Sequence, residues 1–155
     1  MKTIHTYINE KLHVTSKSFY TCHPKTKDEL QKIIIKRIKT DGDECDLNDI
    51  DVSNITNMSF LFNAIDNNSI FRNFNGDISM WDVSNVERMD FMFNYCDKFN
   101  CDLSQWDVSN VKYINGMFNC CKNFNQNLNK WDVSNVKDMW YAFFNCPTQP
   151  KWYKF

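Results

Sequence analysis

Four aspartates in a repeated motif are the residues whose type and spacing could do chemistry. WDVSNV occurs three times and IDVSNI once, at residues 50–55, 81–86, 106–111 and 131–136. The carboxylates in question are Asp51, Asp82, Asp107 and Asp132. One interpretation is a cation site, since Ca²⁺ takes about six to eight oxygen ligands. The other is an Asx-type turn, in which each carboxylate accepts backbone N–H groups. We favour the turn, because one column of acids supplies too few oxygens.

The cysteines are the second candidate for chemistry. Cys96, Cys121 and Cys146 share one repeat position, and Cys101 and Cys120 lie near it in the sequence. A zinc site needs about four ligands that converge tetrahedrally. Equivalent residues of stacked repeats form a line instead, so we expect no metal site. The total of seven cysteines is odd and includes no CxxC pair, which predicts reduced thiols and an intracellular protein.

No constellation of residues predicts an enzyme. His5, His13 and His23 have no cysteine or serine partner at a spacing typical of a catalytic dyad. Three glycines cannot build a glycine-rich phosphate loop, so we expect no cofactor. The net charge of −1 gives no strong positive field that would attract nucleic acid. The basic residues at 25–39 fit a solvated helix face as well as they fit a nucleic-acid-binding face. Nucleic acid is therefore not an expected partner.

The chain shows no signal for a membrane. No run of about 18 apolar residues is present, and the first residues lack the apolar stretch of a signal peptide. We therefore expect no membrane partner and a cytoplasmic location.

The motif belongs to a repeated unit of 25 residues. Trp81, Trp106 and Trp131 are each 25 residues apart, and the first unit carries an insertion at 66–73. After Val111 the apolar residues recur at helical spacing, which predicts a short helix, with Ser84, Ser109 and Ser134 as N-caps of such helices. Around Trp106 apolar and polar residues alternate, which predicts a short strand.

One strand and one helix in such a unit are typical of leucine-rich repeats. We predict an α/β fold, in which residues 45–146 form a four-repeat leucine-rich-repeat-type solenoid with short parallel strands and short helices. Stacking is required, because a single unit cannot bury its apolar face.

The repeats also resemble the BspA-like leucine-rich repeats. The stretches MFNYCDKFNCDLSQWDVSNV and MFNCCKNFNQNLNKWDVSNV carry this resemblance, which extends over about residues 45–146. It implies a right-handed solenoid, protein-binding or adhesive roles, no catalytic residues, and a cysteine column inside the core. The absence of an export signal departs from the adhesins of that family.

Residues 1–44 are expected to cap the first repeat. Thr26 and Glu29 have capping-box spacing, and Gly42 suits a C-cap, so the sequence predicts an amphipathic helix at about 26–40. Its apolar stripe is Leu30, Ile33, Ile34 and Ile38. In the stretches TIHTYI and SFYTCH, apolar and polar residues alternate weakly, which predicts strands and therefore an α/β cap. The alternative is an independent interaction arm.

The tail at 147–155 is expected to close the other end. Pro147 and Pro150 stop any further helix or strand. Trp152 then either folds back over the last repeat, which we favour, or serves as an exposed anchor for a partner.

Partner contacts are expected where the repeats differ. The residue before each motif varies, and it flanks the aspartate column. Asp66–Asn73 is a second candidate, because repeat insertions often bind partners, and aromatic residues near the C-terminus are a third. The predicted contact residues are Asp49, Met80, Gln105, Lys130, Asp82, Asp107, Asp132, Ile70, Phe71, Trp140, Tyr141 and Trp152.

Together these features predict a non-enzymatic, intracellular protein-binding module that acts as a monomer or small homo-oligomer. The expected role is inhibition of a defence or regulatory protein, as by a phage or host-interaction factor. The alternative is a surface adhesin or structural repeat fragment whose export signal is absent.

Overall fold

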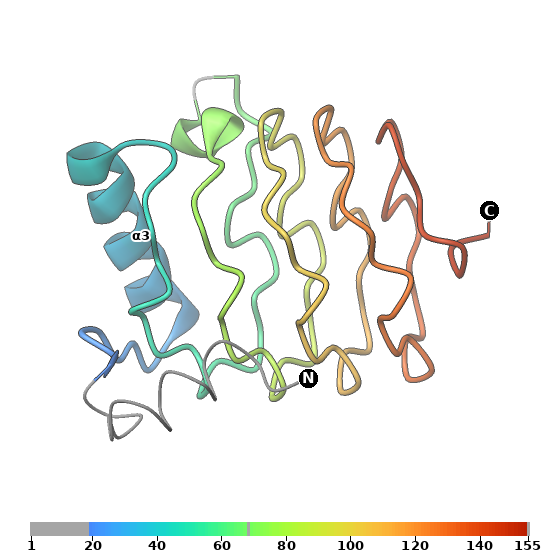
Figure 1. Ribbon diagram of the computed structural model, residues 1–155, viewed down its shortest axis with the longest axis horizontal. Coiled ribbons are helices and arrows are strands. Elements are labelled where there is room, and N and C mark those ends of the chain that lie inside the picture. Colours follow the sequence, from blue (N-terminus) through green and yellow to red (C-terminus); the bar gives the residue numbers. More distant parts are fainter. Residues whose placement is uncertain (1–18, 68, 155) are drawn as a thin grey trace.

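The computed structural model describes residues 19–67 and 69–154, which form a stack of coils behind one helix (Figure 1). The helix is α3 (Lys27–Asp41), and a single-turn 3-10 helix, η1 (Ile70–Asn73), lies in the insertion. Each repeat makes one coil, and the coils follow one another along the long axis from α3 to the C-terminal tail.

The prediction of an α/β leucine-rich-repeat solenoid with parallel strands is wrong. Among the described residues there is no strand and no sheet, and each coil consists of turns. Neighbouring coils are joined instead by isolated parallel bridges, which link Asn57 to Arg88, Arg88 to Tyr113, and Tyr113 to Asp138. The bridges keep equivalent residues in register without building strands.

The predicted short helices are replaced by consecutive turns. Met117 N donates to Ile114 O at 3.2 Å, and Cys121 N donates to Phe118 O at 3.0 Å. Within each turn the backbone takes a positive φ, 55° at Gly116 and 58° at Cys120, which interrupts a right-handed helix. No α-helix starts at Ser84, Ser109 or Ser134.

The alternate amides of this stretch point to the next coil. Ile114, Gly116, Phe118 and Cys120 donate to the carbonyls of Asp138, Trp140, Ala142 and Phe144. The same four-bond ladder joins the earlier coils. An amide that is used between coils cannot make an intrahelical bond, which is why helical spacing of apolar residues produced no helix.

The predicted strand around Trp106 is also a turn. Trp106 N donates to Leu103 O at 3.1 Å, and Val111 N donates to Val108 O at 2.9 Å. The alternation of burial that motivated the strand is correct, however, because Trp106 and Val108 are buried and Asp107 is exposed.

Columns of stacked rings form the core. The rings of Phe62, Phe93, Phe118 and Phe143 follow one another at centroid distances of 5.2, 5.4 and 5.2 Å. Trp106 stacks on Trp81 at 6.5 Å, and its indole Nε1 donates to Ile78 O of the preceding coil at 3.2 Å. Each ring thus buries apolar area, and each indole also ties two coils together.

Helix α3 has the predicted caps and apolar face. Thr26 accepts from Glu29 N at its start, and Gly42 at its end has a φ of 91° and donates to Ile38 O. Leu30, Ile34 and Ile38 are buried, and Ile33 is partly buried against the core. The predicted strand TIHTYI and the candidates His5 and His13 lie outside the described residues. Of SFYTCH, Cys22 makes only an isolated bridge to Ile50.

Side chains of α3 also close the acceptor edge of the first coil. Lys27 Nζ donates to Ser59 O at 3.1 Å, and Gln31 Nε2 donates to Leu61 O at 2.8 Å. In the later coils the equivalent carbonyls, such as Asp90 O and Met92 O, accept amides from the coil before. The helix therefore supplies the donors that a preceding coil would supply.

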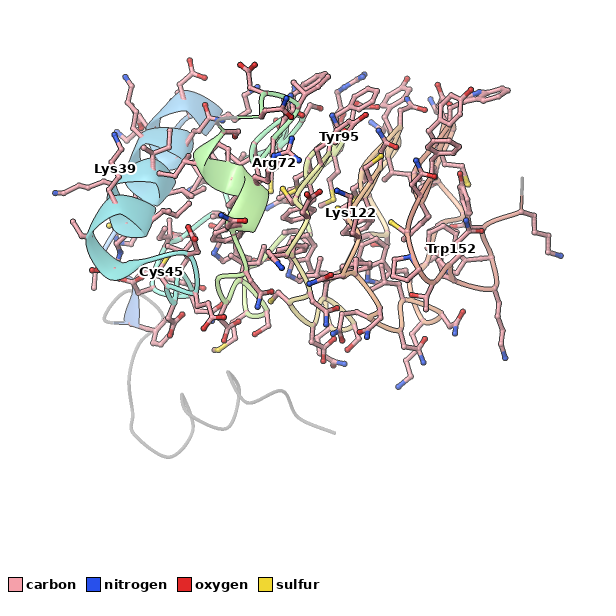
Figure 2. The ribbon with its side chains drawn as sticks, turned by 90° about the horizontal axis from the view of Figure 1, so that it is seen from above. Lys39, Cys45, Arg72, Tyr95, Lys122 and Trp152 are labelled. Atoms are coloured by element: carbon pink, nitrogen blue, oxygen red, sulfur yellow. The ribbon has the colours of Figure 1, made fainter. Side chains whose placement is uncertain are left out.

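The tail folds back, as predicted. Trp152 stacks on Trp131 at 6.4 Å with an interplanar angle of 15°, and its Nε1 donates to Leu128 O at 2.8 Å. Trp131 makes the equivalent bond to Leu103 O. Trp152 thus adds one more ring to the tryptophan column at the end of the stack (Figure 2).

Candidate functional site

The motif aspartates make the predicted turns. Asp82 Oδ1 accepts from Ser84 N at 3.1 Å and from Ser84 Oγ at 2.6 Å, and Asp107 has the same bonds with Ser109. Asp132 accepts from Ser134 N at 3.0 Å. These carboxylates are exposed, but one oxygen of each is committed to its own coil. Among the described residues, no group of three or more His, Cys, Asp or Glu is placed to hold a metal ion.

The cysteine column lies in the interior. All seven cysteines are free. Cys96 Sγ donates to Phe62 O at 3.0 Å, Cys121 Sγ to Phe93 O at 2.9 Å, and Cys146 Sγ to Phe118 O at 2.8 Å. Burial raises the pKa of the Cys96 thiol. The Cys96 thiol is therefore a poor nucleophile and packs as a small apolar residue. Cys146 is only partly buried, and its hydrogen bond with the Cys121 thiol lowers its pKa.

The variable residues before each motif do not form one surface. Asp49 is paired with Arg37 of α3 and accepts from Thr21, so it fixes the cap. Met80 is half-buried, and its amide donates to Asn48 Oδ1 at 2.8 Å. Only Gln105 and Lys130 are exposed.

The apolar residues of the insertion, which were predicted as partner contacts, pack against the core. Phe71 is buried against Phe62 at a centroid distance of 5.6 Å, and Ile70 is partly buried against the core. Arg72 of η1 pairs with Asp97 at 3.2 Å and lies near the Tyr95 ring on the same side of the stack (Figure 2). The insertion is thus docked on its neighbours.

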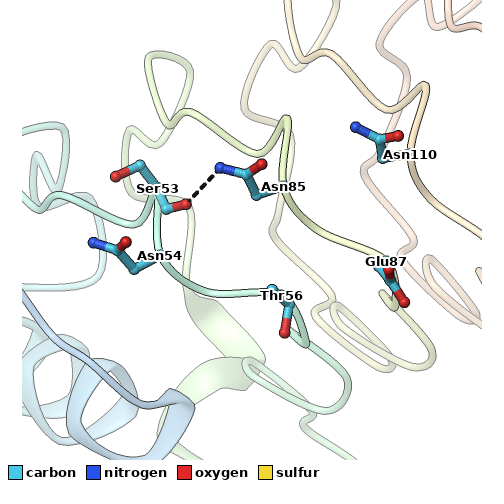
Figure 3. A pocket seen from close by; sticks show the side chains of 6 residues that line it. All are labelled: Ser53, Asn54, Thr56, Asn85, Glu87 and Asn110. Carbon is cyan, nitrogen blue, oxygen red and sulfur yellow. Dashed lines mark hydrogen bonds between the residues drawn. The ribbon is translucent and has the colours of Figure 1, made fainter.

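A polar groove crosses the first three coils (Figure 3). Ser53, Asn54, Thr56, Asn85, Glu87 and Asn110 line it. Asn85 Nδ2 donates to Ser53 O at 2.9 Å, and Asn110 Nδ2 donates to Ser84 O at 2.7 Å. Asn85 and Asn110 therefore each join two coils, and one N–H of each side-chain amide is committed to the scaffold.

The surface that departs from the scaffold is a cluster of three rings on the last coil, called here the aromatic patch: Trp140, Tyr141 and Phe144. Their exposed fractions are 60%, 58% and 49%. The Tyr141 ring contacts those of Phe144 at 5.4 Å and Trp140 at 6.3 Å. Trp140 and Tyr141 were predicted as contacts, and Phe144 was missed.

At the patch, two repeat positions that are polar in the earlier coils carry aromatic residues. The residues equivalent to Trp140 are Ser59, Asp90 and Asn115, and those equivalent to Phe144 are Asn63, Asn94 and Asn119. These polar residues bond from coil to coil: Asn119 Nδ2 donates to Asn94 Oδ1, and Asn115 Nδ2 donates to Asp90 Oδ1, both at 2.8 Å. The last coil replaces both positions with large rings. An alignment of the repeats shows the Phe144 substitution, so the signal was present in the sequence.

A model of one protein family matches residues 30–152, most of the chain and all four coils. The chain belongs to the family described as Mycoplasma protein of unknown function, DUF285. No curated protein and no solved structure matches the chain. Among the described residues of this DUF285 protein, no helix is long and apolar enough to cross a membrane.

The last coil of this DUF285 protein also leaves its donor edge open. In each earlier coil, four alternate amides donate to the next coil, as Met89, Phe91, Phe93 and Tyr95 do. The equivalent amides of the last coil are those of Met139, Tyr141, Phe143 and Asn145. Burial raises the pKa of the Tyr153 phenol in the tail, and the neighbouring backbone of Phe143 and Ala142 opposes the increase. The amides of Met139, Tyr141 and Asn145 have no acceptor within the described residues.

Proposed function

We propose that this chain is a non-enzymatic protein-binding module and that the aromatic patch on its last coil contacts the partner. The observation that carries this proposal is the replacement of two polar scaffold columns by exposed rings, at Trp140 and Phe144. The scaffold does not require these rings, because Asn115 and Asn119 hold the same positions one coil earlier.

The physical chemistry of aromatic side chains supports a binding role. Tryptophan and tyrosine dominate the energy of protein interfaces, because they bury a large area at a small cost in side-chain entropy. Three contacting rings that are each about half exposed or more form a contiguous apolar patch, which marks an interaction site more often than isolated exposed residues do.

Affinity capture from the native cell tests the proposal. The bait variant is Trp140→Asn with Phe144→Asn, which installs the residues that the preceding coil carries, so the variant should fold. We expect the specific partner to be depleted at least about tenfold relative to the wild-type bait. Equal recovery of the same partner by both baits would show that the patch is not the contact surface.

A matched control is available in the first coil. Phe60 is 47% exposed, and its φ of 62° suits asparagine. The Phe60→Asn bait also removes an exposed ring, but at the opposite end of the stack. It should recover the partner as the wild type does; loss with both baits would indicate nonspecific adsorption to aromatic side chains.

The finer role that we propose is inhibition of a regulatory or defence protein in the cytoplasm. The resemblance to BspA-like repeats and the free cysteines support a binding module that keeps its thiols reduced. If the captured partner is an enzyme, its activity should fall when the wild-type chain is added and should be unchanged by the Trp140→Asn, Phe144→Asn variant.

A further inference from the structure

We infer that the last coil binds an extended, acidic segment of its partner, whose main-chain carbonyls accept hydrogen bonds from the Met139 and Tyr141 amides. This inference rests on the proposed protein-binding function and adds the chemistry of the partner. The partner segment would continue the ladder that joins the coils, with its apolar side chains on the aromatic patch.

The spacing of the open amides fits main-chain recognition. Met139 and Tyr141 are two residues apart, and in the earlier coils the equivalent pairs donate to carbonyls that are also two residues apart, as Met89 and Phe91 do to Tyr113 and Asn115 at 2.9 and 2.7 Å. An extended peptide presents carbonyls to one side at alternate residues. Unpaired backbone groups at such an edge are a template for an added chain.

The direction of the inter-coil hydrogen bonds prevents a second copy of this chain from extending the stack as one further coil. Addition of a copy would require its first coil to offer the carbonyls of Ser59 and Leu61. Those carbonyls already accept from Lys27 and Gln31 of α3. Two last coils placed face to face would bring donors against donors. The partner must therefore bring acceptors of its own.

The charge of the tail beside the last coil selects the sign of the partner. Residues 126–146 contain two lysines and two aspartates and are neutral, and Lys151 and Lys154 of the tail bring residues 126–154 to a net charge of +2 at neutral pH. Residues 45–125 are net acidic, so the basic charge is local to this end of the stack. A segment rich in aspartate or glutamate complements it, and such complementarity raises both specificity and association rate.

Synthetic peptides test the inference on the full chain. The probe is an acetylated, amidated octapeptide in which Asp and Phe alternate, so that one face is aromatic and the other acidic. The comparison peptides alternate Lys with Phe, and Asp with Ser. Binding is measured by fluorescence anisotropy, and amide exchange and ¹⁵N shifts are measured by NMR.

We expect the Asp-Phe peptide to bind, to shift the Met139 and Tyr141 amides and to slow their exchange. The two comparison peptides, and the Trp140→Asn, Phe144→Asn variant, should each bind at least about tenfold more weakly. No binding up to about 1 mM peptide, equal binding of the Lys-Phe peptide, or binding without a change at these amides would each overturn the inference.

The two proposals fail separately. If capture of the cellular partner depends on Trp140 and Phe144 while the Asp-Phe peptide leaves the amides unchanged, the protein-binding function stands and the main-chain mode falls. If capture is independent of the patch, the proposed function itself falls.

Discussion

Aspartate side chains stabilise backbone turns in the coils by accepting hydrogen bonds. Besides the motif acids, Asp77 Oδ1 accepts from Ser79 N at 2.9 Å and from Ser79 Oγ at 2.7 Å. Burial raises the pKa of Asp77, but the bonds from Ser79 and its other hydrogen-bonding neighbours outweigh it and hold the pKa below its ordinary value of 3.8. The carboxylate therefore stabilises the fold in its ionised form.

Replacement of Ser79 by alanine should raise the pKa of Asp77, because one bond to the ionised carboxylate is lost. The folded-state pKa of Asp77 lies below the unfolded value, so its contribution to stability is present above pH 3.8 and is lost as the pH falls through the lowered pKa. The melting temperature of Ser79→Ala should thus lie below that of the wild type at pH 7, and the difference should narrow below pH 3.8.

Ser104→Ala is the control for this effect. Only the backbone N of Ser104 bonds Asp102, while its hydroxyl accepts from Gln105 Nε2. Carboxyl ¹³C titration by NMR should show a raised pKa for Asp77 in Ser79→Ala, whereas the melting temperature of Ser104→Ala at pH 7 should match that of the wild type. An unchanged Asp77 titration would mean that Ser79 does not stabilise the carboxylate.

At the scale of the element, α3 acts as a substitute for a missing coil. Its side chains satisfy carbonyls that in later coils accept backbone amides. Gln31→Ala should therefore lower the free energy of unfolding by about 1 kcal/mol, because the partly buried Leu61 carbonyl loses its donor.

Lys36→Ala is the matched control on the same helix, since Lys36 is exposed and alanine preserves helix propensity. Urea denaturation should show a lower midpoint for Gln31→Ala and a change within about 0.5 kcal/mol for Lys36→Ala. Equal effects of both substitutions would indicate that α3 contributes through its apolar face alone.

The elements also show what the sequence could predict. Helix α3 was predictable because its caps and stripe are local signals: Thr26, Gly42 and the buried Leu30, Ile34 and Ile38. The helices within the repeats were not, because consecutive turns bury residues at the same spacing of three and four. The backbone has a positive φ at Phe91 and at Tyr95. Neither residue is a glycine, so the sequence did not indicate this conformation.

The site was predictable in part for a similar reason. Trp140 and Tyr141 were predicted as contacts because they are large aromatic residues near the end of the array, and both are exposed. The pairing of Asp49 with Arg37 and the packing of Phe71 on Phe62 were not predictable, because they depend on which elements meet in space. Phe144 required attention to the asparagine column that it interrupts.

At the scale of the whole molecule, the two ends of the stack differ. The first coil is closed by α3, and the tail closes the core at Trp152. Among the residues that the structure describes, no acceptor meets the Met139, Tyr141 and Asn145 amides of the last coil. A one-dimensional array of this kind has binding capacity at an end, where the inter-coil bonds stop, as well as along its faces.

Native-state hydrogen exchange of the free protein tests this claim most directly. Amides that bond to a next coil should be protected, and amides at an open edge should not be. The Tyr141 and Asn145 amides should exchange at least about a hundredfold faster than the equivalent amides of Phe91 and Tyr95 in the second coil. Equal protection at these positions would show that the donor edge of the last coil is closed and would contradict the account.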